Sequence, residues 1–148
     1  MVHNGIIENF GALKELLTKA GYIFHSDTDT EVLVNFIEYI QDQEQVELDQ
    51  AVRLALNEVI GAYAIAVMSL DEPGHMVVAR LGSPLVLGLG NNEYFVGSDA
   101  TPFLDSTKKV IYLEDGEMAV VSRKGVAVRQ IASDLPVDAV IHQLKLDL

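Results

Sequence analysis

The sequence predicts an α+β protein built from layers, with helices first and mostly antiparallel sheets after them. Between residues 8 and 60 the apolar side chains recur at every third or fourth position, as they do in amphipathic helices. After Gly61 the pattern changes to short β-branched and aromatic runs separated by turn residues, which is typical of strands. Helices followed by strands, with little alternation, indicate the α+β class. A chain of 148 residues is long enough for one domain with a sizeable core.

Three helices are expected ahead of the sheets, at residues 8–20, from Thr28 onward, and at residues 48–60. Gly21 follows the first helix where a left-handed cap would lie. Thr28 and Glu31 match a capping box, in which each side chain accepts from the backbone N–H of the other residue. Residues 22–25 are interpreted as a brief strand. The expected buried faces are Phe10, Leu13, Leu16 and Leu17, then Val32, Leu33, Phe36, Ile37 and Ile40, then Val52, Leu56, Val59 and Ile60.

Seven strands are expected after Gly61, bounded by turn signals such as Asp115-Gly116. The segment 134–148 is predicted to be a helix or an exit segment. At the other end, Val2 is interpreted as the last residue of a strand, Asn4-Gly5 as a tight turn, and the residues after it as the start of a helix. The seven expected strands are residues 62–70, 76–79, 85–89, 94–97, 110–113, 118–121 and 126–131.

Composition narrows the classes of function. Hydrophobic residues make up 49% and charged residues 22%, which is a globular composition. A formal net charge of −12 argues against nucleic acid or an anionic membrane surface as a partner. The absence of cysteine excludes disulfides, thiolate zinc sites and a cysteine nucleophile within these residues. No membrane span or signal segment is recognised, so we expect a cytoplasmic location.

Two motifs resemble ligand sites but lack a required residue. Alternate carboxylates at Asp27, Asp29 and Glu31 imitate an EF-hand loop, yet Val32 stands at the sixth position, where the turn needs glycine. A helix N-terminus, which favours carboxylates, is the simpler interpretation. The glycines of residues 88–92 lack the third glycine of a dinucleotide-binding loop. The four histidines are scattered, which gives a metal site little support, and we expect no metal and no cofactor. No G-x-S-x-G motif, which would mark a serine nucleophile, occurs.

The motif His-Asn-Gly at residues 3–5 carries more information. The side-chain amide of Asn4 and the backbone N–H of Gly5 form a plausible pair of donors for a developing oxyanion. Glycine suits such a place because a substrate must approach the backbone closely and because the turn favours a positive φ. Taken alone, the motif is more often an ordinary Asn-Gly turn than an oxyanion site.

Six segments occur in an order that is specific to one family: VHNGIIEN, SDTDTEV, GAYAIAVM, ARLGSPLVLGLG, YFVGSDATPFL and VIYLEDGE. Their content and order resemble the glutaminase domains of the glucosamine-6-phosphate synthases, which are glutamine–fructose-6-phosphate aminotransferases. These domains belong to the class II glutamine amidotransferases and have the N-terminal-nucleophile hydrolase fold. The resemblance runs from Val2 to about Gly125, and it implies a four-layer αββα sandwich that is incomplete here.

The resemblance also implies roles for three residues. Asn4 and Gly5 match the oxyanion hole of the family, and Asp29 matches the carboxylate that holds the α-ammonium group of glutamine. The family hydrolyses glutamine to glutamate and ammonia, and a separate isomerase domain uses the ammonia to convert fructose 6-phosphate to glucosamine 6-phosphate. We therefore expect glutamine as a ligand, fructose 6-phosphate only through that other domain, and a homo-oligomer.

Departures from the family pattern are equally informative. The family nucleophile is an N-terminal cysteine whose α-amino group is the general base, and this sequence contains no cysteine. The Arg-Trp-Thr-His segment that closes over glutamine has no counterpart, and tryptophan is absent. The expectation is that residues 1–148 are the C-terminal portion of one glutaminase domain, without the isomerase domain, and are inactive alone.

Three alternatives remain open at this point. The chain could be the equivalent part of an amidophosphoribosyltransferase, although those relatives carry Arg-Pro-Leu where residues 82–85 read Gly-Ser-Pro-Leu. It could be a non-catalytic interaction module that oligomerises through exposed sheet edges. An unrelated α+β enzyme using Asp and Glu for acid–base chemistry would require the order of the six segments to be coincidental.

Overall fold

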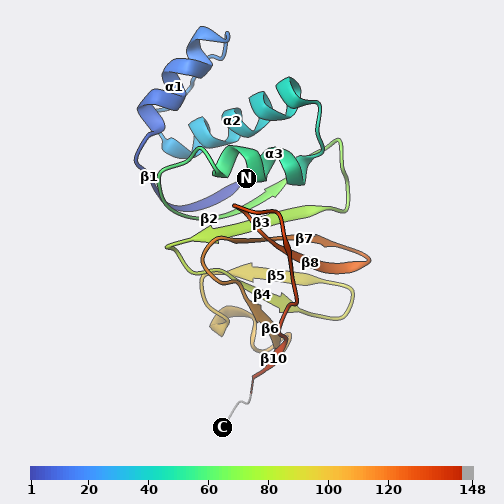
Figure 1. Ribbon diagram of the computed structural model, residues 1–148. Helices are drawn as coiled ribbons and strands as arrows, with labels where there is room; N and C mark the ends of the chain where they lie inside the picture. The colour runs from blue at the N-terminus through green and yellow to red at the C-terminus, as the bar shows by residue number, and fades with distance from the viewer. Residues whose placement is uncertain (145–148) are drawn as a thin grey trace.

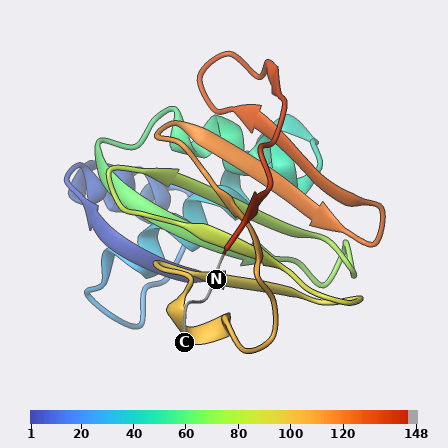
Figure 2. The same ribbon diagram turned by 90° about the horizontal axis from the view of Figure 1, so that it is seen from below.

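Three layers are stacked in the computed structural model, which describes residues 1–144 (Figure 1). Helices α1 (Phe10–Lys19), α2 (Asp29–Glu44) and α3 (Leu48–Leu56) form one outer layer. A six-stranded sheet lies under the helices and a four-stranded sheet under that one. Figure 2, seen from below, places the helices behind the sheets. The α+β class is as predicted, and the described residues supply one helical layer and two sheets.

Both sheets are antiparallel at every pairing of named strands in the described residues. The six-stranded sheet has the order β1-β2-β3-β7-β8-β9, and the four-stranded sheet has the order β10-β6-β4-β5. The strands are β1 (Val2–Ile7), β2 (Gly61–Met68), β3 (Met76–Leu81), β4 (Val86–Leu89), β5 (Tyr94–Gly97), β6 (Lys109–Tyr112), β7 (Glu117–Ser122), β8 (Gly125–Gln130), β9 (Pro136–Val137) and β10 (His142–Gln143). A short 3-10 helix, η1 (Thr101–Phe103), follows β5.

Two apolar cores hold the layers together. The first lies between the helices and the six-stranded sheet, where Leu17 and Leu33 from the helices meet Ile65 of β2. The second lies between the sheets and includes Val78 of β3 and Leu87 of β4. Because side chains alternate along a strand, β2 and β3 contribute to both cores and are covered on both faces.

The seven strands predicted after Gly61 are confirmed as β2 to β8, and several helix predictions need correction. The third helix ends at Leu56 and not at residue 60, and Ile60, predicted to be inward, is 60% exposed in the turn before β2. Residues 22–25 form no strand, because they find no ladder partner. The segment 134–148, predicted to be a helix or an exit segment, forms no helix in its described part and instead carries β9 and β10, each of which adds a strand to one sheet. Residues 145–148 lie outside the described part.

The predicted turn at Asn4-Gly5 is also wrong. Both residues lie inside β1, which runs without a break to Ile7 and pairs along its whole length with β2. The glycine does adopt a positive φ of 121°, as the sequence suggested, but it does so within a strand. Pairing with a strand some sixty residues away overrides the local turn signal.

Two glycines allow β1 and β2 to approach closely. A Cβ atom at Gly5 would lie 2.2 Å from the carbonyl oxygen of Ala62 on β2. A Cβ atom at Gly61, where φ is 134°, would lie 2.2 Å from the carbonyl oxygen of Ile6 on β1. Each strand therefore needs a residue without a side chain opposite the backbone of the other.

The N-terminus of α2 is capped differently from the predicted reciprocal box. Thr28 does cap the helix, accepting from the N–H of Glu31 at 3.3 Å. The Glu31 carboxylate does not return the bond to Thr28, and instead accepts from the N–H groups of His25 at 2.9 Å and Ser26 at 2.8 Å. The hydrogen bond from the His25 N–H, aided by the Ser26 side chain, lowers the pKa of Glu31 below its ordinary value. This carboxylate thus fixes the loop that leads into α2.

Replacing Gly61 should destabilise the protein far more than an equivalent change in a helix. We expect Gly61→Ala to lower the free energy of unfolding by about 2–4 kcal/mol, because it adds a strained φ and a clash with the Ile6 carbonyl. Gly11→Ala in α1, where a Cβ meets nothing within 4 Å, should be neutral or stabilising by up to about 1 kcal/mol. Urea denaturation measures both, and similar values would contradict the close-approach argument.

Glu31 should contribute to the pH dependence of stability. Its folded-state pKa is lowered, so its contribution is present above its ordinary pKa of 4.5 and is lost as the pH falls through the lower folded value. Glu31→Gln should therefore lower stability at neutral pH, and the difference from wild type should vanish in acid. Denaturation across the acid range measures this, with Glu44→Gln at the other end of α2 as control. A difference that persists in strong acid would refute the role of the carboxylate charge.

Candidate functional site

The residues predicted to form the site gather around strand β1. In the register with β2, Asn4 lies opposite Ala64, which belongs to the core between the sheets. His3 lies opposite Ile65, which belongs to the core under the helices. Because successive side chains alternate, Asn4 faces the four-stranded sheet and His3 faces the helices.

The backbone N–H groups of Gly5 and Ile7 point away from β2. The Glu8 N–H donates to the carbonyl oxygen of Ile60 at 2.7 Å, which sets the alternation of ladder bonds along this antiparallel pair. Because the direction repeats every two residues, the N–H groups of Ile6 and Asn4 also point toward β2. The N–H groups of Ile7 and Gly5, which lie between them in sequence, point outward. β1 lies at the end of the six-stranded sheet, so the Gly5 N–H is directed to the outer edge of the sheet.

Asp29 lies at this same edge. It is the first residue of α2, and its Oδ2 atom accepts from the Ile7 N–H at 3.0 Å. Its side chain is 24% exposed, and Oδ1 lies 3.9 Å from Nδ1 of His3. The structure therefore brings Asp29 to the outer edge of β1 at Ile7, two residues along the strand from Gly5. The Asn4 side chain lies on the face of β1 toward the other sheet.

His3 is part of this cluster, although the sequence indicated roles only for Asn4, Gly5 and Asp29. Its side chain is 2% exposed, and its Nδ1 atom lies 2.9 Å from the hydroxyl oxygen of Thr30 in the first turn of α2. The Nε2 atom is buried and has no hydrogen-bond partner among the described residues. The alternation of side chains along a strand would have placed His3 on the face toward the helices, but the sequence predicted a turn at residues 4–5 and not a strand.

A small cavity adjoins Asn4 between the two sheets. It has a volume of about 110 Å³. Pro84 and Leu85 of the Gly-Ser-Pro-Leu segment, and Ser98 after β5, contribute to its wall. This volume is below the roughly 300–1,000 Å³ of common ligand pockets, so the cavity suits one end of a small ligand.

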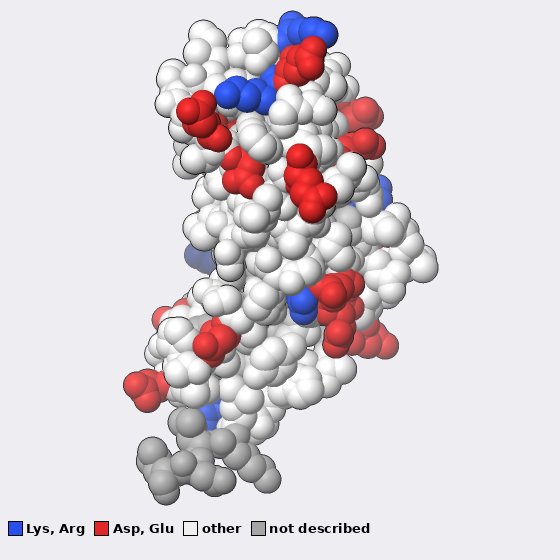
Figure 3. All heavy atoms as spheres, turned by 90° about the vertical axis from the view of Figure 1, so that its left-hand side faces the viewer, with Lys and Arg blue, Asp and Glu red and all other residues white. Residues whose placement is uncertain are grey.

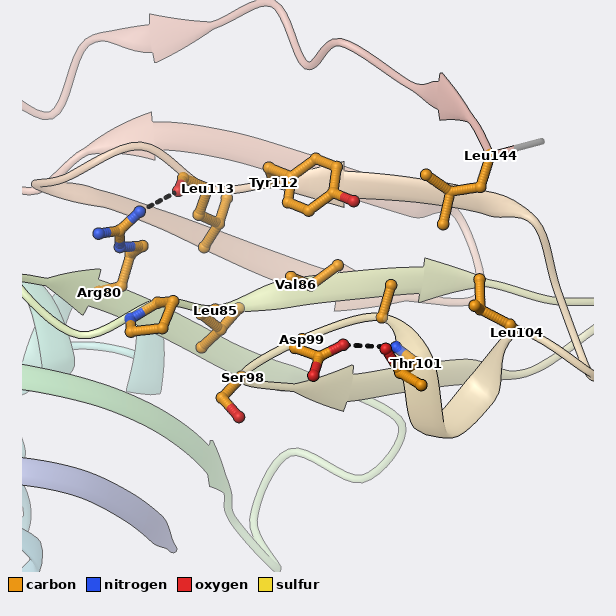
Figure 4. A pocket seen from close by; sticks show the side chains of 12 residues that line it. Arg80, Leu85, Val86, Ser98, Asp99, Thr101, Leu104, Tyr112, Leu113 and Leu144 are labelled. Atoms are coloured by element: carbon orange, nitrogen blue, oxygen red, sulfur yellow. Dashed lines mark hydrogen bonds between the residues drawn. The ribbon is translucent and has the colours of Figure 1, made fainter. Parts of the chain in front are cut away.

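A larger cavity of about 370 Å³ shares Pro84, Leu85 and Ser98 with the small one (Figure 4). Arg80 reaches over it, donating to the carbonyl oxygen of Leu113 at 2.8 Å and to the Asp115 carboxylate at 2.7 Å. On the opposite side the N–H of Thr101 donates to Asp99 and lowers the pKa of that carboxyl group. None of Asn4, Gly5 and Asp29 lines this cavity.

The face of the molecule that carries α1 is acidic. Figure 3 shows Asp and Glu side chains spread over the face that carries α1, with isolated Lys and Arg among them. In the described part of the chain, no helix has the length and apolar character needed to cross a bilayer. Within residues 1–144, no group of three or more His, Cys, Asp or Glu side chains is placed to hold a metal ion.

Comparisons with known proteins agree on one family. The family described as "Glutamine amidotransferase domain" matches residues 1–105. The glutamine–fructose-6-phosphate aminotransferase [isomerizing] of Bacteroides thetaiotaomicron is 57% identical over 123 residues, which cover 83% of this chain and 20% of that protein. The protein of the same name from Thermococcus kodakarensis is 45% identical over 149 residues, covering 100% of this chain and 24% of that protein.

A solved structure supports the same assignment. The glutamine phosphoribosylpyrophosphate amidotransferase of B. subtilis, complexed with ADP and GMP, superimposes with a TM-score of 0.74 at 29% identity. The match covers 90% of this chain and 29% of that one. The predicted fold type, that of the N-terminal-nucleophile amidotransferases, is therefore confirmed.

The matches cover only part of the length of each relative. The chain spans about a fifth to a quarter of the length of the curated relatives described above. The matched family and the fold nonetheless extend over most of the 148 residues. This chain belongs to the glutamine amidotransferase domain family.

Proposed function

We propose that these residues form the glutamine-binding part of a glutaminase domain. The observation that carries the proposal is the hydrogen bond from the Ile7 N–H to Asp29, which holds a carboxylate at the edge toward which the Gly5 N–H points. Asp29 pairs with the α-ammonium group of glutamine. The Gly5 N–H and the Asn4 side-chain amide donate to the carboxamide oxygen.

The spacing supports a glutamine bound along β1. Neighbouring N–H groups on one edge of a strand are two residues, or roughly 6.6 Å, apart. The α-ammonium nitrogen and the carboxamide carbon of extended glutamine are separated by four carbon–carbon or carbon–nitrogen bonds, about 5 Å. A ligand with its amino group at Asp29, beside Ile7, can therefore present its carboxamide at Gly5.

The chemistry that this arrangement serves is acyl transfer from a primary amide. A thiolate adds to the carboxamide carbon, and the negative charge that develops on oxygen is stabilised by the donors of Asn4 and Gly5. Collapse of this tetrahedral intermediate, with one proton delivered to the nitrogen, releases ammonia and leaves a thioester, which water hydrolyses to glutamate and the free thiol. No cysteine occurs among the 148 residues, so the nucleophile must come from outside them.

The wider reaction is also a proposal. Transfer of the ammonia to fructose 6-phosphate, in a separate isomerase domain of a homo-oligomeric enzyme, is supported by the names of relatives that are 57% and 45% identical. An amidophosphoribosyltransferase is the alternative, supported by the B. subtilis structure at 29% identity. The aminotransferase is favoured because its identities are higher and because residues 82–85 lack the Arg-Pro-Leu sequence. A cytoplasmic location stays a prediction.

A second candidate function is a non-catalytic interaction module. Val2 and Ile6 on the outer strand β1 are 73% and 71% exposed, and apolar side chains on a sheet edge invite association. Sedimentation and glutamine titration of the purified chain together test this case, because self-association without any binding of glutamine would favour the interaction module.

Removing the charge of Asp29 should weaken glutamine binding. We expect Asp29→Asn to raise the Kd for glutamine about 10–100-fold, the loss of one charge-assisted hydrogen bond. Asp27→Asn is the matched control, because Asp27 is fully exposed in the loop two residues before Asp29. Titration calorimetry or NMR measures both. Equal effects of the two substitutions would contradict the assignment of Asp29.

A polypeptide of these 148 residues should bind glutamine without hydrolysing it. The physical reason is the missing thiolate, since oxyanion donors alone do not open a covalent route. A coupled assay for glutamate and ammonia measures this. Sustained turnover by the purified polypeptide would refute the proposed division between binding residues and nucleophile.

Asn4 should act on the transition state more than on binding. In a chimera where this chain replaces the aligned segment of the Thermococcus kodakarensis aminotransferase, we expect Asn4→Ala to lower kcat about 10²–10³-fold with little change in KM. Leu70→Ala, a fully exposed apolar position beyond the end of β2, is the control and should leave kcat unchanged. A loss confined to KM would argue against an oxyanion role.

A further inference from the structure

The buried imidazole of His3 joins strand β1 to the first turn of α2. Its Nδ1 atom is 2.9 Å from Oγ1 of Thr30, across 27 positions of sequence. Thr30 directly follows Asp29, so a bond to Thr30 holds the turn from which the Asp29 carboxylate projects. His3 itself lies two residues from Gly5 along β1.

The arrangement leaves one oxygen of Asp29 open. Oδ2 is held by the Ile7 N–H at 3.0 Å, whereas Oδ1 lies 3.9 Å from the His3 ring, beyond hydrogen-bond distance. The imidazole therefore fixes the location of the carboxylate through Thr30 without occupying its second oxygen. A carboxylate held in this way on rigid elements is preorganised for a ligand cation.

The other ring nitrogen of His3, Nε2, makes the imidazole energetically unfavourable at this position. Nε2 is buried without a partner among the described residues, which disfavours an imidazole relative to an apolar side chain of similar size. The contact of Nδ1 with Thr30 is what an apolar side chain at this position could not supply.

We propose that His3 is a positioning residue for the amino-group site: through Thr30 it fixes the Asp29 carboxylate at the edge of β1 where the α-ammonium group of glutamine binds. The inference rests on the proposed function. It adds a residue that never touches glutamine and acts only through Asp29.

Two substitutions at position 3 separate the hydrogen bond from the packing. His3→Leu keeps a buried side chain of similar size and removes Nδ1, whereas His3→Asn keeps a polar atom near the place of Nδ1. We expect His3→Leu to raise the Kd for glutamine about 10-fold and His3→Asn to stay within about 3-fold of wild type. Thr30→Val, an isosteric change at the other end of the bond, should match His3→Leu and carries the test if that variant does not fold.

A ligand without the amino group shows whether the effect passes through Asp29. Glutaramic acid has the carboxamide and carboxylate of glutamine but no α-ammonium group, so its affinity should not respond to His3→Leu. In an Asp29→Asn background, His3→Leu should have no further effect on glutamine. Without ligand, the amide resonance of Ile7 should move in His3→Leu and stay in place in His3→Asn, because that N–H reports the bond to Asp29.

Each contrary result has a distinct meaning. The inference is overturned if His3→Leu and Thr30→Val leave the affinity for glutamine unchanged. It is also overturned if His3→Leu lowers the affinity for glutaramic acid as much as that for glutamine, or if His3→Asn binds glutamine as weakly as His3→Leu does. If the wild-type chain does not respond to glutamine, or Asp29→Asn binds it as the wild type does, the proposed function fails and the inference fails with it. The inference alone fails when Asp29→Asn weakens binding and the His3 variants do not.

Discussion

The antiparallel pairing of β1 with β2 is the contact on which the candidate site depends. It joins residues some sixty positions apart, and it requires glycine at positions 5 and 61 because each faces the backbone of the opposite strand at very close range. In this pairing the N–H groups of alternate residues of β1 donate to β2, and the N–H groups of the residues between them point to the edge of the sheet. The N–H groups of Gly5 and Ile7 are therefore oriented by the sheet itself.

Strand β1 thereby directs its polar groups to three different sides. Asn4 projects toward the four-stranded sheet, His3 projects under the helices, and the N–H groups of Gly5 and Ile7 lie in the plane between them. Asp29, the first residue of α2, joins the helix to the edge of β1 by accepting from the Ile7 N–H. A helix N-terminus favours a carboxylate for electrostatic reasons, and the same carboxylate is left with one oxygen for a ligand. Structural and binding roles are thus compatible in this residue.

The family assignment and the local geometry support each other. The matched amidotransferase family covers residues 1–105, which include the whole of β1, the helices and both walls of the small cavity at Asn4. The residues after it mainly complete the sheets through β6 to β10. In the proposed function these residues bind glutamine and a nucleophile outside them breaks the amide bond, since no cysteine occurs among the 148 residues and oxyanion donors lower a barrier only when a nucleophile is present.

The sequence by itself determined the α+β class, the seven strands after Gly61 and the family, because hydrophobic periodicity, turn residues and ordered motifs are local properties of the chain. It also indicated Asn4, Gly5 and Asp29. Only the tertiary structure decided that Asn4-Gly5 lies in a strand, that Glu31 holds the preceding loop, and that His3 bonds to Thr30. These features arise from hydrogen bonds and strand pairing that depend on how the layers pack, and local periodicity carries no information about such partners.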